Sequence, residues 1–211
     1  MTIRLFQTAL ALLVAFTLVQ AVHAQDGQRR ARIESLDHVA AAIPEHGTAS
    51  IKPADTQEQA SFSGNGRMGA LVFGRPDFET LILNRGDRFS STNAASPGLT
   101  LRLNLPLTGE VASDYLRTEN VRTGEVTVCW RDGEVSYARR LFVSRPDNLI
   151  VMRITADHRN SISFRLSLGE IAGQPNQPTS VFEPGWITSH NVHQHEAGGF
   201  DAVVRVIPEG G

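Results

Sequence analysis

Residues 126–143 read VTVCWRDGEVSYARRLFV, and this stretch decides the fold. Val126–Trp130 and Glu134–Val143 are rich in β-branched and aromatic residues, which favour strands. Between the two runs stands Arg131-Asp132-Gly133. An Asp-Gly pair supplies the positive φ angles that a tight hairpin needs, so the two runs are predicted to pair as antiparallel neighbours.

Apolar and polar residues alternate on both sides of this hairpin in the sequence. Leucine occupies every second position from Leu99 to Leu107, and Ile162–Leu168 alternates in the same way. A period of two places one strand face in a core and the other toward water, as in antiparallel sheets. Further strands are predicted at Met68–Phe73, Phe78–Asn84, Asn148–Ala156, Val181–Ser189 and Asp201–Ile207. About nine short strands with almost no helical periodicity predict an all-β fold, an antiparallel β-sandwich.

The composition narrows the class of protein. The chain has 211 residues, which suits one domain with a short extension. Its formal net charge of −2 gives no clustered basic excess, so no nucleic-acid partner is expected. The single cysteine, Cys129, lies in a strand-like run without a basic neighbour and is predicted to be a buried, inert thiol.

Residues 1–24 follow the pattern of a signal peptide. Arg4 precedes an apolar run, Leu5–Val22, and small residues at the cleavage positions of Val22-His23-Ala24 come before polar Gln25. An uncleaved anchor is the alternative, but polar residues dilute the run and no basic cluster follows it. We therefore expect an exported bacterial protein, periplasmic or extracellular, that leaves the membrane after cleavage.

The mature chain is expected to have two parts: a polar leader at residues 25–50 and a β-sandwich domain at residues 51–211. A short helix is compatible with Ser35–Ala42 in the leader. The chain halts in a turn-like Pro208-Glu209-Gly210-Gly211 directly after a predicted strand. The sandwich domain is therefore expected to be incomplete at its C-terminus, and a natural domain boundary is the alternative.

The loop Gly64-Asn65-Gly66-Arg67 is the first candidate for a binding role. Its glycines permit unusual backbone angles, and Asn65 and Arg67 present hydrogen-bond donors that suit sugar hydroxyls or a neighbouring domain. The alternative, slightly favoured, is a structural turn in which Asn65 bonds its own backbone. A phosphate-binding loop fits less well, because no lysine follows and no helix begins there.

A histidine cluster suggests a metal site at first sight. His190, His193 and His195, followed by Glu196, are close in sequence. A polar loop between two strands is the favoured interpretation, because no second ligand cluster is evident. No metal and no cofactor are expected.

Two further sets of residues bear on carbohydrate chemistry. The acidic residues fall in predicted turns, where solvated carboxylates are usual, so no catalytic pair is assigned. They are Asp132, Glu134, Glu183, Glu196 and Asp201. Trp130 and Trp186 have the shape of sugar-stacking platforms, but their apolar surroundings favour core packing.

Three blocks of the sequence resemble one enzyme family. The first runs from Ser63 to Gly74, SGNGRMGALVFG, and is followed by a strand that ends in Leu83-Asn84. The second spans Gly124–Asp157, and the third is Val204–Gly211. In this order they resemble the N-terminal domain of glycoside hydrolase family 95, the α-L-fucosidase and α-L-galactosidase group. The sequence departs from the family pattern after Asn84, where Arg85-Gly86-Asp87 replaces Glu-Asp-Thr.

The resemblance implies a supersandwich-like domain in front of a helical linker and an (α/α)6 catalytic barrel. In that family the catalytic residues lie in the barrel, so no catalytic residue carries over to this chain. Asn65, Arg67 and Asn84 are the candidate substrate-binding or domain-docking residues of this chain. The expected function is that of an accessory domain, inactive alone, in an exported enzyme that acts on terminal α-L-fucosyl or related residues. The alternative is a self-standing, exported carbohydrate-binding or interaction module.

Overall fold

The computed structural model describes residues 40–85, 99–109, 111–169, 179–192 and 199–209. Met1–Ile43 and Pro44–Gly211 form two compact units. In the first unit, residues 40–42 are helical, and the rest of the helix predicted at Ser35–Ala42 lies outside the described residues, as does the predicted signal peptide. No helix within the described ranges is long and apolar enough to cross a membrane. The remaining description concerns the second unit.

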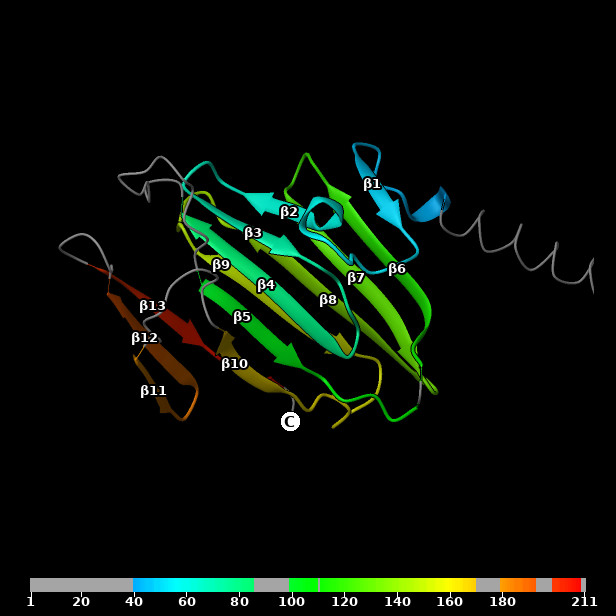
Figure 1. Cartoon of the computed structure of the whole chain (residues 1–211). Coiled ribbons are helices and arrows are strands. Elements are labelled where there is room, and N and C mark those ends of the chain that lie inside the picture. The colour runs from blue at the N-terminus through cyan, green and yellow to red at the C-terminus, as the bar shows by residue number, and fades with distance from the viewer. Residues whose placement is uncertain (1–39, 86–98, 110, 170–178, 193–198, 210–211) are drawn as a thin grey trace, which may run out of the picture. The chain divides into compact units, whose positions relative to one another are not determined.

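Two antiparallel sheets form the body of this unit (Figure 1). The first sheet has the order β1-β6-β7-β8-β9, and the second has the order β10-β5-β4-β3-β2. The strands of the first sheet are Gly47–Ser50 (β1), Ser113–Asn120 (β6), Glu125–Asp132 (β7), Val135–Val143 (β8) and Ile150–Ala156 (β9). Those of the second are Ser61–Gly64 (β2), Met68–Val72 (β3), Phe78–Arg85 (β4), Leu99–Asn104 (β5) and Arg165–Gly169 (β10). A short 3-10 helix, Gln57–Gln59 (η1), lies on the connection from β1 to β2.

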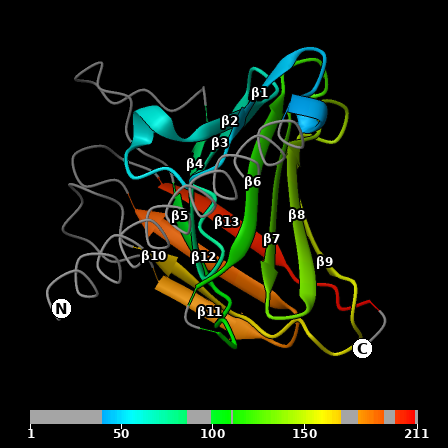
Figure 2. The ribbon, with the colours of Figure 1, turned by 90° about the vertical axis from the view of Figure 1, so that its right-hand side faces the viewer.

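The two sheets lie face to face around one core, and Figure 2 shows them as two layers. The second sheet contributes Ala70, Val72, Leu81 and Leu101, together with Leu105 just after β5. The first sheet contributes Val126, Val128, Trp130, Tyr137 and Leu141. Burying one such large side chain stabilises the fold by about 1.5–3 kcal/mol relative to leaving it in water. The all-β antiparallel sandwich predicted from alternation is confirmed.

A third antiparallel sheet, β11-β12-β13, follows the two-sheet body. Its strands are Thr179–Glu183, Trp186–Val192 and Gly199–Arg205. Val204 of β13 packs against the core of the sandwich. The third sheet therefore extends the same hydrophobic core.

The central hairpin forms as predicted. In β7 and β8 the register pairs Trp130 with Tyr137 and Asp132 with Val135. The turn itself differs from the prediction: Asp132 is paired with Val135, so the two-residue loop is Gly133-Glu134 and not Asp132-Gly133. Gly133, at the first position of this loop, has φ +61°, as a two-residue hairpin with glycine first requires, whereas Asp132 has no positive φ. The strands predicted at Met68–Phe73, Phe78–Asn84, Leu99–Leu107, Asn148–Ala156 and Asp201–Ile207 are also confirmed, with small shifts at their ends.

Two strand predictions are wrong in part. Val181–Ser189 was expected as one strand, but β11 ends at Glu183 and β12 begins at Trp186. Pro184-Gly185 reverses the chain between them, and Gly185 has φ +78°. In the predicted strand Ile162–Leu168, β10 begins only at Arg165. The alternating pattern therefore starts three residues before the strand does.

Three strands were not predicted. β1 lies within the segment expected as a polar leader, and it pairs with β6. β2 holds two serines and a glycine among its four residues, and its buried positions are serines rather than apolar residues. β6 reads SDYLRTEN, its buried residue is Arg117, and its register to β7 shifts between Ser113 and Leu116. In β2 and β6 the buried positions are polar, and β1 has no fully buried residue, so no apolar alternation marks these strands.

Candidate functional site

The loop Gly64–Arg67 joins β2 to β3 at one end of the second sheet. Asn65 Oδ1 accepts hydrogen bonds from the backbone N–H groups of Arg67, at 2.9 Å, and Met68, at 2.8 Å. Gly66 has φ +87°, an angle that glycine adopts without strain. Asn65 therefore closes the turn on itself, as the structural alternative predicted.

The same asparagine also joins the two sheets. Its Nδ2 donates to the carbonyl of Ser144, at 2.8 Å, and to Oδ1 of Asn148, at 3.0 Å. Ser144 and Asn148 lie on the turn from β8 to β9 in the first sheet. Asn65 is thus a tie between loops about 80 residues apart in the chain.

The glycines beside this loop make room for an aromatic ring. Gly64 and Gly69 are register partners on β2 and β3. A Cβ atom at either position would lie 2.7 Å from ring atoms of Phe62. The ring lies on bare backbone at the edge of the sheet, an arrangement known to stabilise glycine pairs in strands. Packing of Phe62 therefore accounts for two of the glycines in the motif.

The other two predicted site residues lie at the same end of the second sheet. Arg67 is exposed, and Asn84 on β4 is exposed opposite Gly69 on β3. The topology thus brings Asn84 to the same end of the second sheet as Asn65 and Arg67, although it is far from them in the sequence. Asn65 faces the first sheet, while Arg67 and Asn84 face solvent.

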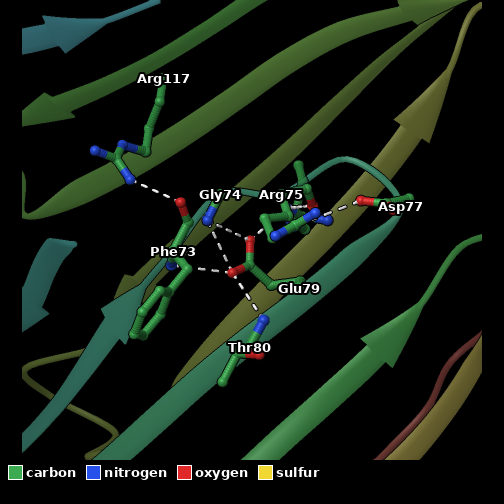
Figure 3. Close-up of polar contacts among 8 residues, drawn as sticks. Phe73, Gly74, Arg75, Asp77, Glu79, Thr80 and Arg117 are labelled. Atoms are coloured by element: carbon green, nitrogen blue, oxygen red, sulfur yellow. Dashed lines mark hydrogen bonds and ion pairs between the residues drawn. The ribbon is translucent and has the colours of Figure 1, made fainter. Parts of the chain in front are cut away.

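A buried ion pair lies near the opposite end of β3, between Glu79 on β4 and Arg139 on β8. Figure 3 shows Glu79 beside the turn from β3 to β4. The Glu79 carboxylate and the Arg139 guanidinium are in direct contact, and their side chains are 0% and 2% exposed. Glu79 also accepts hydrogen bonds from the backbone N–H groups of Phe73, Gly74 and Thr80, at 2.9–3.0 Å. Burial raises the pKa of Glu79, while the Arg139 charge and these three donors act in the opposite direction. Sequence reasoning missed this pair.

Arg139 links the two sheets through more than one group. Its Nη2 also donates to the carbonyl of Arg75 at 2.9 Å. Its guanidinium lies 5.2 Å from the centre of the Trp130 ring, and that ring stacks on Tyr137 with 5.2 Å between centroids. Trp130 is buried, so the core position predicted for it is confirmed.

A second buried arginine stands beside the pair. Arg117 on β6 donates to the carbonyl of Phe73 at 2.7 Å (Figure 3). It also donates to the carbonyl of Gln59 at 2.8 Å. It anchors the connection between β1 and β2 and the turn after β3 onto the first sheet. Tyr115 lies beside it, and burial raises the pKa of that phenol. Two guanidinium groups and one carboxylate thus share the interior at this turn.

The acidic residues considered as catalytic candidates have other roles or are solvent-exposed. Asp132 is buried at 3% exposure, contrary to the solvated position expected for it. Desolvation acts to raise the pKa of Asp132, but the N–H groups of Thr108 and Gly109, at 2.6 and 3.0 Å, together lower it. Glu134 and Glu183 are exposed, and Glu196 lies outside the described residues.

The histidine cluster is described only at its start. His190 Nδ1 lies 2.6 Å from Asp201 Oδ1, across the register of β12 and β13. His193 and His195 lie outside the described residues. Among the residues that the structure describes, no three His, Cys, Asp or Glu side chains are grouped to hold a metal ion. Cys129 is half-buried and not fully buried as predicted, and the Arg140 charge acts on it. Desolvation is the larger effect and raises the pKa of its thiol, which supports an unreactive role.

Trp186 differs from the prediction that it packs in the core. It is 41% exposed, and the Arg205 guanidinium lies 5.0 Å from its ring centre. Trp186 begins β12 directly after the Pro184-Gly185 turn, on the face of the third sheet that points to solvent. Because side chains alternate along β12 and the next residue, Ile187, is buried, the ring of Trp186 lies outside the core.

These features define a class of protein: an antiparallel β-sandwich domain whose two sheets are tied by buried polar side chains. Residues 99–211 match the family model described as "Glycosyl hydrolase family 65, N-terminal domain". The chain therefore belongs to this family of glycoside hydrolase N-terminal domains. The general expectation from sequence, a glycoside hydrolase N-terminal domain, is confirmed, although the matching model is that of family 65 and not of family 95. No curated protein matches the chain.

Proposed function

We propose that this chain is the non-catalytic N-terminal domain of an exported glycoside hydrolase that acts on terminal α-L-fucosyl or related residues. The observation that carries the proposal is the match of residues 99–211 to a glycoside hydrolase N-terminal domain. The resemblance of Ser63–Asn84 to family 95 supports the narrower choice of sugar. These residues supply strands β2 to β4 of the same sandwich. On this proposal the acid and base groups belong to a catalytic barrel outside this sequence.

The loop end of the second sheet is the proposed contact with that barrel or its substrate. Arg67 and Asn84 are exposed there. Asn65 attaches this end of the sheet to the first sheet by its hydrogen bond to Ser144. A loop held by four hydrogen bonds keeps the Arg67 backbone in place, so its side chain can be presented without ordering a flexible segment. The domain then acts as a rigid support for a neighbouring domain.

The activity test compares this chain with a longer product that includes the downstream reading frame. We expect no hydrolysis of an aryl α-L-fucoside by the 211-residue chain and turnover by the longer protein. In the longer protein, Arg67→Ala is expected to lower kcat/KM, whereas Arg75→Ala, at the other end of β3, is expected to leave it unchanged. Hydrolysis by the purified chain alone, above a boiled control, would overturn the proposal.

Export is tested separately. Mass spectrometry of the protein secreted by a bacterial host is expected to show a mature N-terminus at Gln25, after Ala24. A cytoplasmic product that keeps Met1 would contradict export without affecting the family assignment.

A further inference from the structure

The third sheet has one face turned toward the core and one turned toward solvent. On β12, Ile187, Ser189 and Asn191 are buried, at 7%, 0% and 3% exposure. Side chains alternate along a strand, so Trp186, Thr188 and His190 lie on the opposite face. All three are exposed.

The register arranges this solvent face in rows across the three strands. Glu183, Trp186 and Arg205 form one row, and Thr179, His190 and Asp201 form another. Thr188 stands between two valines in the row between them. Every one of these side chains is exposed, including those of the two valines.

The row of Trp186 offers an oriented aromatic surface. The Arg205 guanidinium lies over the ring at 5.0 Å, a cation–π contact that holds the indole in one position. With 41% of its surface exposed, Trp186 keeps apolar area in contact with water. A fixed aromatic ring with a polar edge binds ligands that have one apolar face and hydrogen-bonding groups around it.

The row of His190 offers hydrogen bonds. His190 and Asp201 are paired at 2.6 Å, and their side chains are 60% and 66% exposed. The pair therefore presents both donors and acceptors to solvent. His190 is four residues from Trp186 on one strand, which separates the two rows by about 14 Å. A ligand that contacts both rows must extend over several units.

The charges on this face select the kind of ligand. Arg205 offsets one of the two carboxylates, Glu183 and Asp201, so the face carries no large net charge of either sign. A nucleic acid requires a basic surface, and the centre of a stable protein interface is depleted of charged residues. A neutral, hydroxyl-rich chain fits both the aromatic ring and the balanced polar groups.

We propose that the solvent face of the third sheet is a binding site for a neutral oligosaccharide. Trp186 stacks on one sugar ring, and the His190–Asp201 pair hydrogen-bonds a sugar further along the chain. The site concerns binding and involves no bond cleavage. It rests on the proposed function only for the choice of a fucosylated probe, since any neutral sugar chain presents the same chemistry.

The fluorescence of the chain itself reports the site. The protein has two tryptophans, and Trp130 is buried at 2% exposure, so acrylamide quenches mainly Trp186. We expect fucosylated xyloglucan oligosaccharides, added to the 211-residue chain, to protect Trp186 from quenching in a saturable manner. Calorimetry with the same probe gives the affinity. Trp186→Ala should weaken binding at least about tenfold, as for an aromatic residue at the centre of a contact.

Phe182 provides the matched control. It is 63% exposed on the same hairpin, but its register partner Ile187 places it on the opposite face. Phe182→Ala should therefore bind as the wild type does, and Trp186→Phe should retain part of the affinity. A wild-type chain that binds none of the fucosylated and unfucosylated neutral probes, or a Trp186→Ala variant that binds equally well, would overturn the proposal. The proposal would also be overturned if the protection of Trp186 from quenching increased with protein concentration and did not depend on sugar concentration. That result would indicate self-association of the chain.

These outcomes are independent of hydrolysis. If the 211-residue chain binds oligosaccharide without cleaving it, both proposals are supported. If the longer enzyme is active but no sugar binds at Trp186, only the proposal of a binding site on the third sheet is overturned.

Discussion

Glu79 and Arg139 form a direct ion pair inside the sandwich, although 60 residues separate them in the chain. Glu79 is on β4 of the second sheet, and Arg139 is on β8 of the first. Charges are costly to bury alone, so each group depends on the other and on the N–H donors around it. This pair joins the two layers by charge where the surrounding core joins them by apolar packing.

Removing the carboxylate should unfold the protein more easily. Glu79→Gln leaves Arg139 buried without a counter-charge, and we expect it to lower the free energy of unfolding by about 3–5 kcal/mol. Urea denaturation measures the change. Asp77→Asn is the control, because its pair with Arg75 is 3.8 Å long and half-exposed and should contribute about 0–1 kcal/mol. Equal effects of the two substitutions would show that the buried pair is not special.

Substitutions at two glycines with positive φ, Gly66 and Gly74, distinguish the cost of backbone strain from the cost of a steric clash. Gly66 has φ +87°, and a Cβ atom added there would meet no atom within 4 Å, so Gly66→Ala should cost about 1–2 kcal/mol from its backbone angle alone. At Gly74, with φ +83°, a Cβ would lie 2.6 Å from Tyr115 Oη and 2.8 Å from Arg117 Cδ. We expect Gly74→Ala to lower the melting temperature further than Gly66→Ala does.

The clash at Gly74 has its own test. Tyr115→Phe removes the hydroxyl, so the double variant Gly74→Ala/Tyr115→Phe should lose less stability than the sum of the single variants. Additive losses would mean that the hydroxyl is not the obstructing group.

Asn65 should matter for stability through its amide nitrogen. Asn65→Asp keeps the acceptor for the turn but replaces the donor to Ser144 and Asn148 with a second oxygen. We expect a loss of about 1–3 kcal/mol in chemical denaturation, because two acceptors then face an oxygen. Arg67→Ala, on the same loop but exposed, should change stability by less than about 0.5 kcal/mol. If Asn65→Asp left the stability unchanged, the hydrogen bonds of Asn65 to Ser144 and Asn148 would not contribute to holding the two sheets together.

Asp157 should titrate at unusually low pH. The hydrogen bond from His158, supported by the N–H of Ser136, lowers the pKa of Asp157 from its ordinary 3.8 to about 2. Since the folded chain favours the ionised form, this stabilisation is complete above pH 3.8 and disappears as the pH falls through about 2. An NMR titration of the Asp157 carboxyl carbon measures the midpoint, and His158→Ala should move it toward 3.8. An identical midpoint in the variant would rule out His158 as the main cause.

The sequence predicted the fold where apolar residues carry the pattern. The β7–β8 hairpin and the leucines of β5 could be placed, because alternation and an Asp-Gly turn are local signals. β6 could not, because its inward residue is Arg117 and its charge is balanced by carbonyls of distant segments. Pro184-Gly185 is a local turn signal within the predicted strand Val181–Ser189, and it separates β11 from β12.

The candidate site was predicted less completely than the fold. Asn65 was recognised as a turn residue, but its bonds to Ser144 and Asn148 depend on tertiary structure. The buried pair had one usable signal: Arg139 stands between Tyr137 and Leu141 at inward positions of β8, so a carboxylate partner was required. Nothing local identifies that partner as Glu79.

The ties between the sheets also bear on how this domain can be divided. The family match begins at Leu99, yet Glu79, Asn65 and the carbonyl of Gln59 that holds Arg117 all lie before it. A fragment starting at residue 99 would lack β1 to β4. Arg139 would then be left without its counter-charge, and Arg117 without its carbonyl acceptors. It is therefore not an autonomous folding unit, and exchange of this domain between enzymes, by recombination or by engineering, requires a boundary that precedes Gly47.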